Sequence, residues 1–258
     1  MHYRRYVAIG DSCAEGLDDP YPDGSGYRGW TDLVAGGLAR TSPSLEYANL
    51  AVRGRRLDQI RAEQLPAAVA LRPDLMTLFG GGNDVLQSRW QTTADALDEI
   101  VAAMAGAART VVLFTLPDIA RLPGLGRLRP RVRQLNDLIA ATSARYGTQL
   151  VDVRDDEYCH DERLYGEDRL HLGPLGHRRV AAHVLTALDV PPDPAWLAPL
   201  PPALREPVWR TAARHWLWVR RHVYPAVHST VRNKLLGREP GDGFVPKRPE
   251  PSPVTPMP

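Results

Sequence analysis

The chain has 258 residues, of which 43% are hydrophobic and 24% are charged. These proportions are those of an ordinary globular protein, and they exclude wholesale disorder and collagen-like structure. The formal net charge of +2 excludes a strong overall field that would attract nucleic acid. The charge is uneven, because residues 191–258 hold 10 Lys or Arg against 5 Asp or Glu, whereas residues 1–190 carry a local charge of −3. The sequence therefore predicts an acidic main domain followed by a basic extension.

The main domain, residues 1–190, alternates short apolar runs with longer amphipathic stretches. The runs predict strands over 5–9, 46–49, 75–79, 110–115 and 149–153, and the stretches predict helices over 30–40, 93–108, 132–146 and 174–188. Several runs are continuously apolar, as strands covered on both faces should be. This alternation predicts an α/β fold with a parallel sheet between two helical layers, whose strands all end at one ligand-binding edge.

The extension divides into two parts. Residues 191–237 predict a Pro-rich linker and then a basic, Trp-rich helix over 203–223, and the Pro- and charge-rich residues 238–258 predict a disordered tail. One face of the predicted helix carries Leu204, Val208, Ala212, Trp216, Val219 and Val223. Two interpretations remain open for this helix: packing on the main domain, or peripheral contact with an anionic membrane surface. The tryptophans fall on more than one face, which favours packing.

Compartment and metal content follow from the cysteines and the N-terminus. Cys13 and Cys159 are too few for a disulfide framework, and no C-x-x-C pair is present for zinc. The apolar run at residues 6–9 is shorter than the core of a signal peptide, and no stretch approaches the ~20 apolar residues of a membrane span. We therefore expect a soluble, cytoplasmic protein without a metal.

The sequence Gly10-Asp11-Ser12 directly follows the first predicted strand. A serine at a strand-to-helix junction has an accessible hydroxyl and a backbone N–H close to a helix N-terminus, which suits a nucleophile whose attack creates an oxyanion. The alternative is that Asp11 or Ser12 is simply a helix cap. Taken alone, the motif supports both interpretations equally.

Two further glycine motifs follow the second and third predicted strands. Gly54 would let the backbone approach a ligand closely, although a plain turn glycine is the commoner alternative. Residues 80–82 are all glycine and precede Asn83, whose side-chain amide would then reach the same sheet edge. Because neither glycine pattern of nucleotide-binding loops is present, no nucleotide cofactor is expected.

The segment Asp168-Arg169-Leu170-His171 lies between the last predicted strand and the last predicted helix. A histidine in a loop can accept the proton of a serine, and an aspartate three residues earlier can hold its ring and stabilise the imidazolium. An ordinary surface D-x-x-H segment is the likelier interpretation when this motif is taken alone. The order of the four motifs and their common position at one sheet edge are much more specific than any one of them.

Taken together, the four motifs resemble those of the SGNH hydrolases, also called GDSL esterases and lipases, over residues 5–188. The resemblance implies a flavodoxin-like three-layer sandwich with a five-stranded parallel sheet, to which this chain adds a C-terminal helical extension. It implies Ser12 as nucleophile, His171 as general base and Asp168 as the residue that orients it. It also implies an oxyanion hole made by the N–H groups of Ser12 and Gly54 and the side-chain amide of Asn83. No cofactor is implied.

The function expected from this resemblance is hydrolysis of small-molecule carboxylic esters, with short or lipid-like acyl groups, through an acyl-enzyme. The same triad could instead serve an acyltransferase or a deacetylase of sugars or natural products. A catalytically silent binding module, or a protein recruited to membranes by the extension, is the alternative from another class. The motifs do not choose among substrates, and they leave the oligomeric state open.

Overall fold

The computed structural model describes residues 2–86, 90–118, 122, 125–154, 156, 161–202 and 207–257. At its centre is a six-stranded sheet with the order β5-β4-β3-β1-β2-β6. The five parallel strands are β1 (Arg5–Gly10), β2 (Glu46–Asn49), β3 (Leu75–Phe79), β4 (Thr110–Phe114) and β5 (Gln149–Val151). Each agrees with a predicted strand to within two residues, so the predicted parallel sheet is confirmed.

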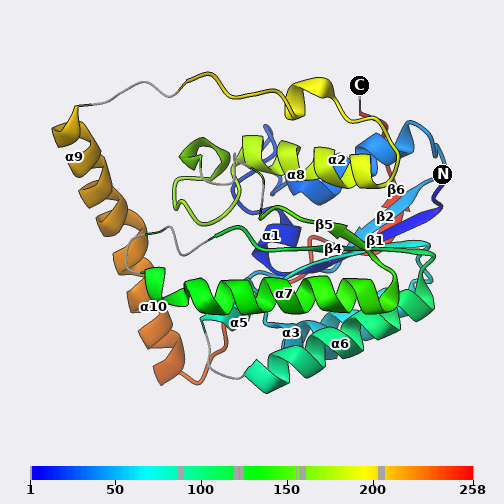
Figure 1. Cartoon of the computed structure of the whole chain (residues 1–258), viewed down its shortest axis with the longest axis horizontal. Helices are drawn as coiled ribbons and strands as arrows, with labels where there is room; N and C mark the ends of the chain where they lie inside the picture. The colour runs from blue at the N-terminus through cyan, green and yellow to red at the C-terminus, as the bar shows by residue number, and fades with distance from the viewer. Residues whose placement is uncertain are drawn as a thin grey trace.

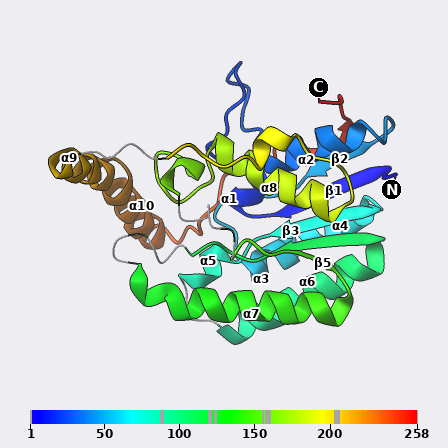
Figure 2. The ribbon, with the colours of Figure 1, turned by 45° about the horizontal axis from the view of Figure 1, so that its top comes forward.

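Helices cover both faces of this sheet, which confirms the predicted three-layer sandwich (Figures 1 and 2). The layer on one face contains α2 (Gly29–Ala39) and α8 (Pro174–Ala187). The other face is covered by α6 (Trp90–Ala107) and α7 (Arg129–Tyr146), together with α3 (Leu57–Gln59), the π-helical turn η1 (Ile60–Gln64) and α4 (Leu65–Ala70). The last three elements, over residues 57–70, were not among the predicted helices.

An aromatic cluster packs beneath the edge where the parallel strands end. The rings of Phe79 and Phe114, from the ends of β3 and β4, stack with centroids 4.7 Å apart, and Trp30 lies 4.8 Å from Phe114. All three side chains are at most 2% exposed. The Trp30 indole also donates a hydrogen bond to the carbonyl of Cys13 (2.9 Å). Buried aromatic contacts of this kind stabilise this edge of the sheet.

The predicted helix at 203–223 is longer in the structure. It comprises α9 (Val208–Trp218), the π-helical turn η7 (Val219–Val223) and α10 (Tyr224–Leu235), and residues 203–206 lie outside the described residues. We call residues 208–235 the helical arm, which runs beside the strand ends (Figure 1). Two residues of the predicted apolar face, Trp216 (61%) and Val219 (38%), are exposed. Across the described residues, no helix is long and apolar enough to cross a membrane.

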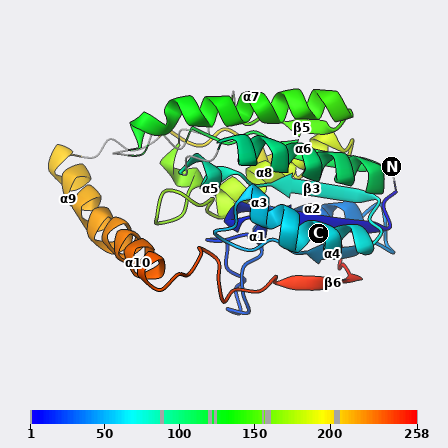
Figure 3. The same cartoon turned by 90° about the horizontal axis from the view of Figure 1, so that it is seen from below.

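The prediction of a disordered tail over 238–258 is wrong for most of that segment. Residues 237–257, here called the strap, return along the domain, and β6 (Arg248–Pro253) joins the sheet antiparallel to β2 (Figure 3). Lys247 fastens the turn before β6, because its ammonium donates to the carbonyl of Tyr27 (3.1 Å) and pairs with Asp32 (3.0 Å). The sheet is therefore mixed, with one antiparallel edge strand added to the five predicted ones.

Candidate active site

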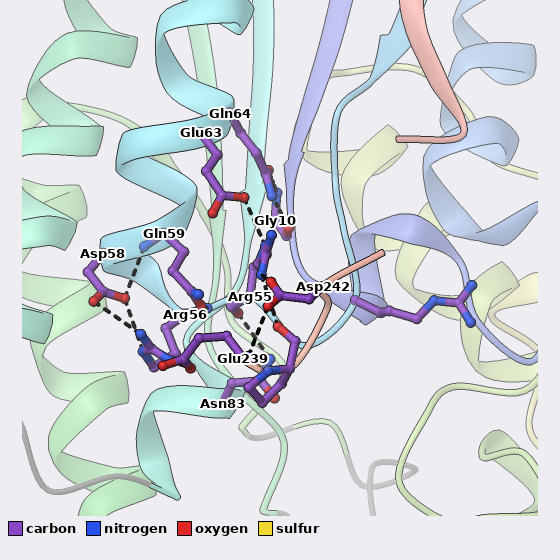
Figure 4. Close-up of polar contacts among 12 residues, drawn as sticks. Gly10, Arg55, Arg56, Asp58, Gln59, Glu63, Gln64, Asn83, Glu239 and Asp242 are labelled. Atoms are coloured by element: carbon purple, nitrogen blue, oxygen red, sulfur yellow. Dashed lines mark hydrogen bonds and ion pairs between the residues drawn. The ribbon is translucent and has the colours of Figure 1, made fainter. Parts of the chain in front are cut away.

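The first motif lies where β1 ends and the short helix α1 (Ser12–Glu15) begins. Gly10 has φ +149°, and a Cβ atom there would lie 2.2 Å from the Phe79 carbonyl oxygen, so no other residue fits. The side-chain amide of Gln64 accepts from the Gly10 N–H and donates to the Gly10 carbonyl, both at 2.9 Å (Figure 4). Asp11 caps α1 by accepting from the N–H of Cys13 (3.1 Å). The cap and the candidate nucleophile are thus two adjacent residues with different roles.

The structure brings Ser12, His171 and Asp168 into one hydrogen-bonded chain. Nε2 of His171 lies 2.9 Å from Oγ of Ser12, and Nδ1 lies 2.5 Å from Oδ2 of Asp168. The second carboxylate oxygen of Asp168 accepts from the N–H groups of Leu170 (2.8 Å) and His171 (3.0 Å), which fixes the loop that carries both residues. This is the geometry of a serine nucleophile, its base and the group that orients the base.

The charges within this chain support a histidine base. Burial of His171 opposes its protonation, but the hydrogen bond and charge of Asp168 outweigh burial and raise the pKa of His171 above its usual value. Burial likewise acts to raise the pKa of Asp168, yet its bonds to His171 prevail and lower it. Both shifts favour an ionised Asp168 beside a protonated imidazole, which is the charge pair that base catalysis by His171 would create.

Asn83 lies beside this chain. It belongs to α5 (Gly82–Val85), and its side-chain amide donates to the carbonyl of Arg55 (3.0 Å; Figure 4). The amide also donates to Oδ2 of Asp11 (3.3 Å). Asn83, Ser12 and His171 line the same cavity. The amide is thus held near the serine, where an oxyanion donor is needed.

Gly54 is placed differently from the other four predicted site residues. Among the described residues, those that line the cavity with Ser12 do not include Gly54. Gly54 has φ +78°, and a Cβ atom there would lie 2.9 Å from both Pro240 and Gly241 of the strap. The glycine is therefore required by the close approach of another segment of the chain, the strap, whereas the sequence suggested a ligand or a plain turn. Its N–H as an oxyanion donor stays a prediction.

Two buried carboxyl groups support the site: Asp11, which the sequence suggested only as a possible helix cap, and Asp84, for which it suggested no role. Burial raises the pKa of Asp11 to about 7 and that of Asp84 to about 6. Asp84 accepts from the N–H of Leu57 (3.1 Å) and from the hydroxyl of Thr93 (3.2 Å), which ties α5 to the neighbouring helices. Both follow directly from the predicted motifs, since Asp11 precedes Ser12 and Asp84 follows Asn83. In the sequence, the only indication of a supporting role for these two carboxyl groups is their position next to a predicted site residue.

The cavity beside Ser12 has a volume of about 140 Å³ and is lined mainly by apolar side chains. The apolar lining comes from several elements and loops and includes Phe79, Leu86, Leu116, Leu125, Val153, Leu164, Leu170, Leu172 and Val180. A polar cluster also borders the cavity: Asp156 accepts from Arg179 (2.7 Å) and contacts Nε2 of His183 (2.8 Å). His183 of α8 thus also lines the cavity.

Neither the thiol nor a metal changes this interpretation. Burial raises the pKa of Cys13 well above its usual value, so its thiol stays protonated and a poor nucleophile. Within the part of the chain that the structure describes, the one group of three ligating side chains within 4.8 Å of one another is Asp18, Asp168 and His171. Two of these three form the hydrogen-bonded chain to Ser12, so a cation bound there would compete with proton transfer.

The helical arm also reaches the site, which the sequence did not indicate. The indole N–H of Trp218 donates to the main-chain carbonyl of Asp168 (2.9 Å), and the guanidinium of Arg169 lies over the same indole, 5.1 Å from its centre. Trp218 of the helical arm therefore holds the loop that carries Asp168 and His171. Helical spacing alone could not reveal this contact, because the partner is a backbone atom of a distant loop.

Comparison with known proteins defines the class. The model of the GDSL-like lipase/acylhydrolase family matches residues 8–179, a range that includes all of the predicted site residues from Ser12 to His171. The chain belongs to this family. With the fold and the serine chain described above, it is an SGNH-type serine hydrolase that acts on ester bonds.

Solved structures of the same fold extend this comparison. LAE5, an α/β hydrolase enzyme from the metagenome of Lake Arreo, Spain, is 22% identical with a TM-score of 0.59, covering 72% of this chain and 95% of its own. Axe2, an acetylxylan esterase from Geobacillus stearothermophilus, is 18% identical with a TM-score of 0.55, covering 72% of this chain and 94% of its own. These likenesses establish the shared fold. No curated protein sequence matches the chain.

Proposed function

We propose that the protein hydrolyses carboxylic esters with small apolar acyl groups through an acyl-enzyme on Ser12. The observation that carries the proposal is the chain Ser12–His171–Asp168, with contacts of 2.9 and 2.5 Å. The volume of the cavity beside Ser12 supports a small acyl group. A cavity of about 150 Å³ accommodates a benzene ring, and the cavity beside Ser12 measures about 140 Å³.

The reaction would follow from the positions of these groups. Nε2 of His171 removes the proton of Ser12 as Oγ forms a bond to the ester carbonyl carbon, and the carbonyl π pair moves onto oxygen. The N–H of Ser12, the N–H of Gly54 and the amide of Asn83 stabilise that oxyanion. The C–O bond to the alcohol then breaks, and His171 returns its proton to the leaving alkoxide. Water repeats the sequence on the acyl-enzyme and releases the acid.

The test uses p-nitrophenyl esters of increasing acyl length with the wild-type chain and with Ser12→Ala. We expect hydrolysis to be fastest for acyl groups of up to roughly six carbons, because the cavity has about the volume of one benzene ring, and Ser12→Ala to abolish it. A fluorophosphonate should label Ser12, as read by peptide mass spectrometry. A label on another residue, or unchanged hydrolysis in Ser12→Ala, would refute the acyl-enzyme.

Acyl transfer and deacetylation of sugars use the same chemistry with another acceptor or substrate. The Axe2 structures, whose fold this chain shares, are acetylxylan esterases. Acetylated xylo-oligosaccharides should therefore be assayed beside the p-nitrophenyl esters, with and without an alcohol acceptor. A higher kcat/KM for the sugar ester would assign the deacetylase function, and formation of a new ester would assign the transferase.

A second candidate role concerns the helical arm, and a specific observation favours it. The arm exposes Trp209 (67%) and Trp216 (61%), and exposed arginines accompany them at 210, 214, 220 and 221. Tryptophan beside arginine on an exposed helix suits an anionic bilayer surface, where the ring enters the interface and the guanidinium meets the headgroups. We propose peripheral, reversible contact of this face with anionic lipid.

Vesicle co-sedimentation tests this second role. We expect binding to vesicles of phosphatidylglycerol and phosphatidylcholine that falls as salt rises, no binding to pure phosphatidylcholine, and loss of binding in Trp209→Ala/Trp216→Ala. Equal sedimentation with both vesicle types, or binding that the double variant retains, would remove the proposal. Esterase activity on a soluble ester serves as the control, since neither tryptophan borders the cavity residues described above.

A further inference from the structure

The strap crosses the loop that follows β2 and fastens it with charges. Nη1 of Arg55 contacts Oδ1 of Asp242 (2.9 Å) and the carbonyl of Pro240 (3.1 Å), and Nη1 of Arg56 contacts Oε2 of Glu239 (2.8 Å) (Figure 4). The two arginine side chains are only 12% exposed, whereas their acidic partners are 44% and 55% exposed. The acids thus cover the arginines from the solvent side.

The loop and the strap also meet backbone to backbone. A Cβ atom on Gly54 would lie 2.9 Å from the strap, and a Cβ atom on Gly241 (φ +92°) would lie 2.4 Å from the carbonyl oxygen of Arg53. Each chain therefore carries a glycine at the point where the other approaches most closely. The two backbones therefore pack so closely that neither position has room for a methyl group.

The same loop holds Asn83. The carbonyl of Arg55 accepts one hydrogen bond from the Asn83 amide (3.0 Å), and Asp242 binds the guanidinium of this same residue. On the domain side, Arg55 pairs with Glu63 (2.8 Å) and Arg56 with Asp58 (3.1 Å). Each arginine is thus held between one acid of the domain and one acid of the strap, and the backbone between them orients Asn83.

We propose that Glu239 and Asp242 are positioning residues for the oxyanion hole. By holding Arg55 and Arg56 they fix the loop that contains Gly54 and the carbonyl that orients Asn83, so two of the three proposed donors depend on the strap. The inference rests on the proposed function, because it assigns the strap a role in that reaction. Neither acid touches the reacting atoms.

The energetics separate this role from a role in folding. Both acids are largely exposed, each arginine keeps its acidic partner on the domain, and the strap has separate anchors in β6 and in the contacts of Lys247 with Tyr27 and Asp32. Removing the two charges should therefore leave the fold in place. Catalysis is more sensitive, because a displacement of about 1 Å in a catalytic group can cost roughly 100-fold in rate.

The test is the isosteric double variant Glu239→Gln/Asp242→Asn in the full chain, with Glu250→Gln as the matched control. Glu250 is an exposed acid of the same strap, so its substitution removes a charge at a distance from Arg55 and Arg56. We expect kcat for p-nitrophenyl butyrate to fall roughly three- to tenfold in the double variant with little change in KM, because donors of the transition state are loosened. The control should retain the wild-type kcat.

Two further measurements keep the inference falsifiable. Salt screens exposed ion pairs, so rising NaCl should lower the wild-type kcat toward that of the double variant and leave the variant itself unchanged. The conservative variant Asp242→Glu should recover part of the loss. Unchanged kcat in the double variant, or an equal fall in Glu250→Gln, would overturn the inference.

Fluorophosphonate labelling distinguishes this failure from failure of the proposed function. If Ser12 is labelled and the wild-type chain hydrolyses esters, an unaltered double variant refutes only the role of the strap. If the wild-type chain neither hydrolyses esters nor takes the label, the proposed function itself fails. A lower melting temperature in the double variant, accompanied by loss of labelling, would assign the acids to folding and also overturn the positioning role.

Discussion

The main domain and the C-terminal extension contact the active site in different ways. The domain supplies every side chain of the hydrogen-bonded chain Ser12–His171–Asp168 and the amide of Asn83. In the part of the extension that the structure describes, Trp218 reaches the carbonyl of Asp168, and the strap reaches the loop of Arg55 and Arg56. The domain therefore provides the reacting groups, and these two contacts of the extension are made to the loops that hold them.

The charge division between the two regions is now explained in part. The basic extension does not simply lie on an acidic domain. Lys247 of the strap pairs with Asp32, but at residues 239–242 the signs are reversed, and Glu239 and Asp242 meet Arg56 and Arg55 of the domain. Specific pairs, and not the net charges of the two regions, determine where the strap binds. If this comparison is right, changes in the domain should abolish activity, and changes in the extension should only reduce it.

The largest expected effect is that of Asp168→Asn, in the domain. The pKa of His171 is raised by Asp168 against the effect of burial, and the base must be neutral to accept the proton of Ser12. The wild-type kcat/KM should therefore fall with decreasing pH at a point above the usual histidine pKa of about 6.5. Without the carboxylate, burial remains, so this acid limb should move to lower pH.

Asp168→Asn should also remove the group that holds His171 in the correct tautomer and should lower kcat by about 10⁴-fold. Rates of p-nitrophenyl ester hydrolysis measured across pH test this. Ser12→Ala is the inactive reference for this series. An acid limb that stays at the wild-type pH would mean that Asp168 does not set the protonation of His171. The assignment of the chain of hydrogen bonds would then have to change.

A smaller loss is expected for Asn83→Ala. Removal of one oxyanion donor typically costs about 10²–10³ in kcat, and the KM should change little because the donor acts mainly in the transition state. Asn83→Asp keeps the size of the side chain and places a carboxylate beside Asp11, so it should be at least as slow. A raised KM at unchanged kcat would instead make Asn83 a substrate-binding residue.

The structure also indicates which parts of this arrangement the sequence could predict. Short apolar runs, several of them continuous, identified all five parallel strands, and the order of the motifs placed Ser12, Asn83, Asp168 and His171 at one edge, because parallel strands end together. These predictions depend on local pattern and on topology. They required no knowledge of contacts between distant segments.

The strand β6 could not be predicted in this way. Prolines at 249, 251 and 253 are typical of disordered tails, yet they fall two residues apart. Along an edge strand every second N–H points away from the neighbour, so prolines with this spacing leave the remaining donors free to pair with β2. Val254 continues the pattern by donating to the carbonyl of Leu45 (3.2 Å). Composition alone does not separate such a strand from disorder.

The contacts of the extension could not be predicted either, because nothing in the sequence around Arg55, Asp242 or Trp218 indicates the partner of each side chain. Their partners are 187 and 50 positions away along the chain. Gly54 illustrates the same limit: the sequence offered close approach to a ligand or a plain turn there, and it could not identify the strap as the approaching segment.

The smallest expected effect is that of Trp218→Phe, in the extension. The substitution keeps an aromatic ring beneath Arg169 but removes the N–H that donates to the Asp168 carbonyl. Because one neutral hydrogen bond contributes about 0.5–1.5 kcal/mol, the loop should loosen slightly and kcat should fall only a few-fold, with the acid limb of the pH profile unchanged. Trp209→Phe, on the exposed face of the same helix, is the control. A loss in Trp218→Phe as large as that in Asn83→Ala would mean that the extension does more than hold a loop, since one distant donor would then matter as much as a group at the oxyanion.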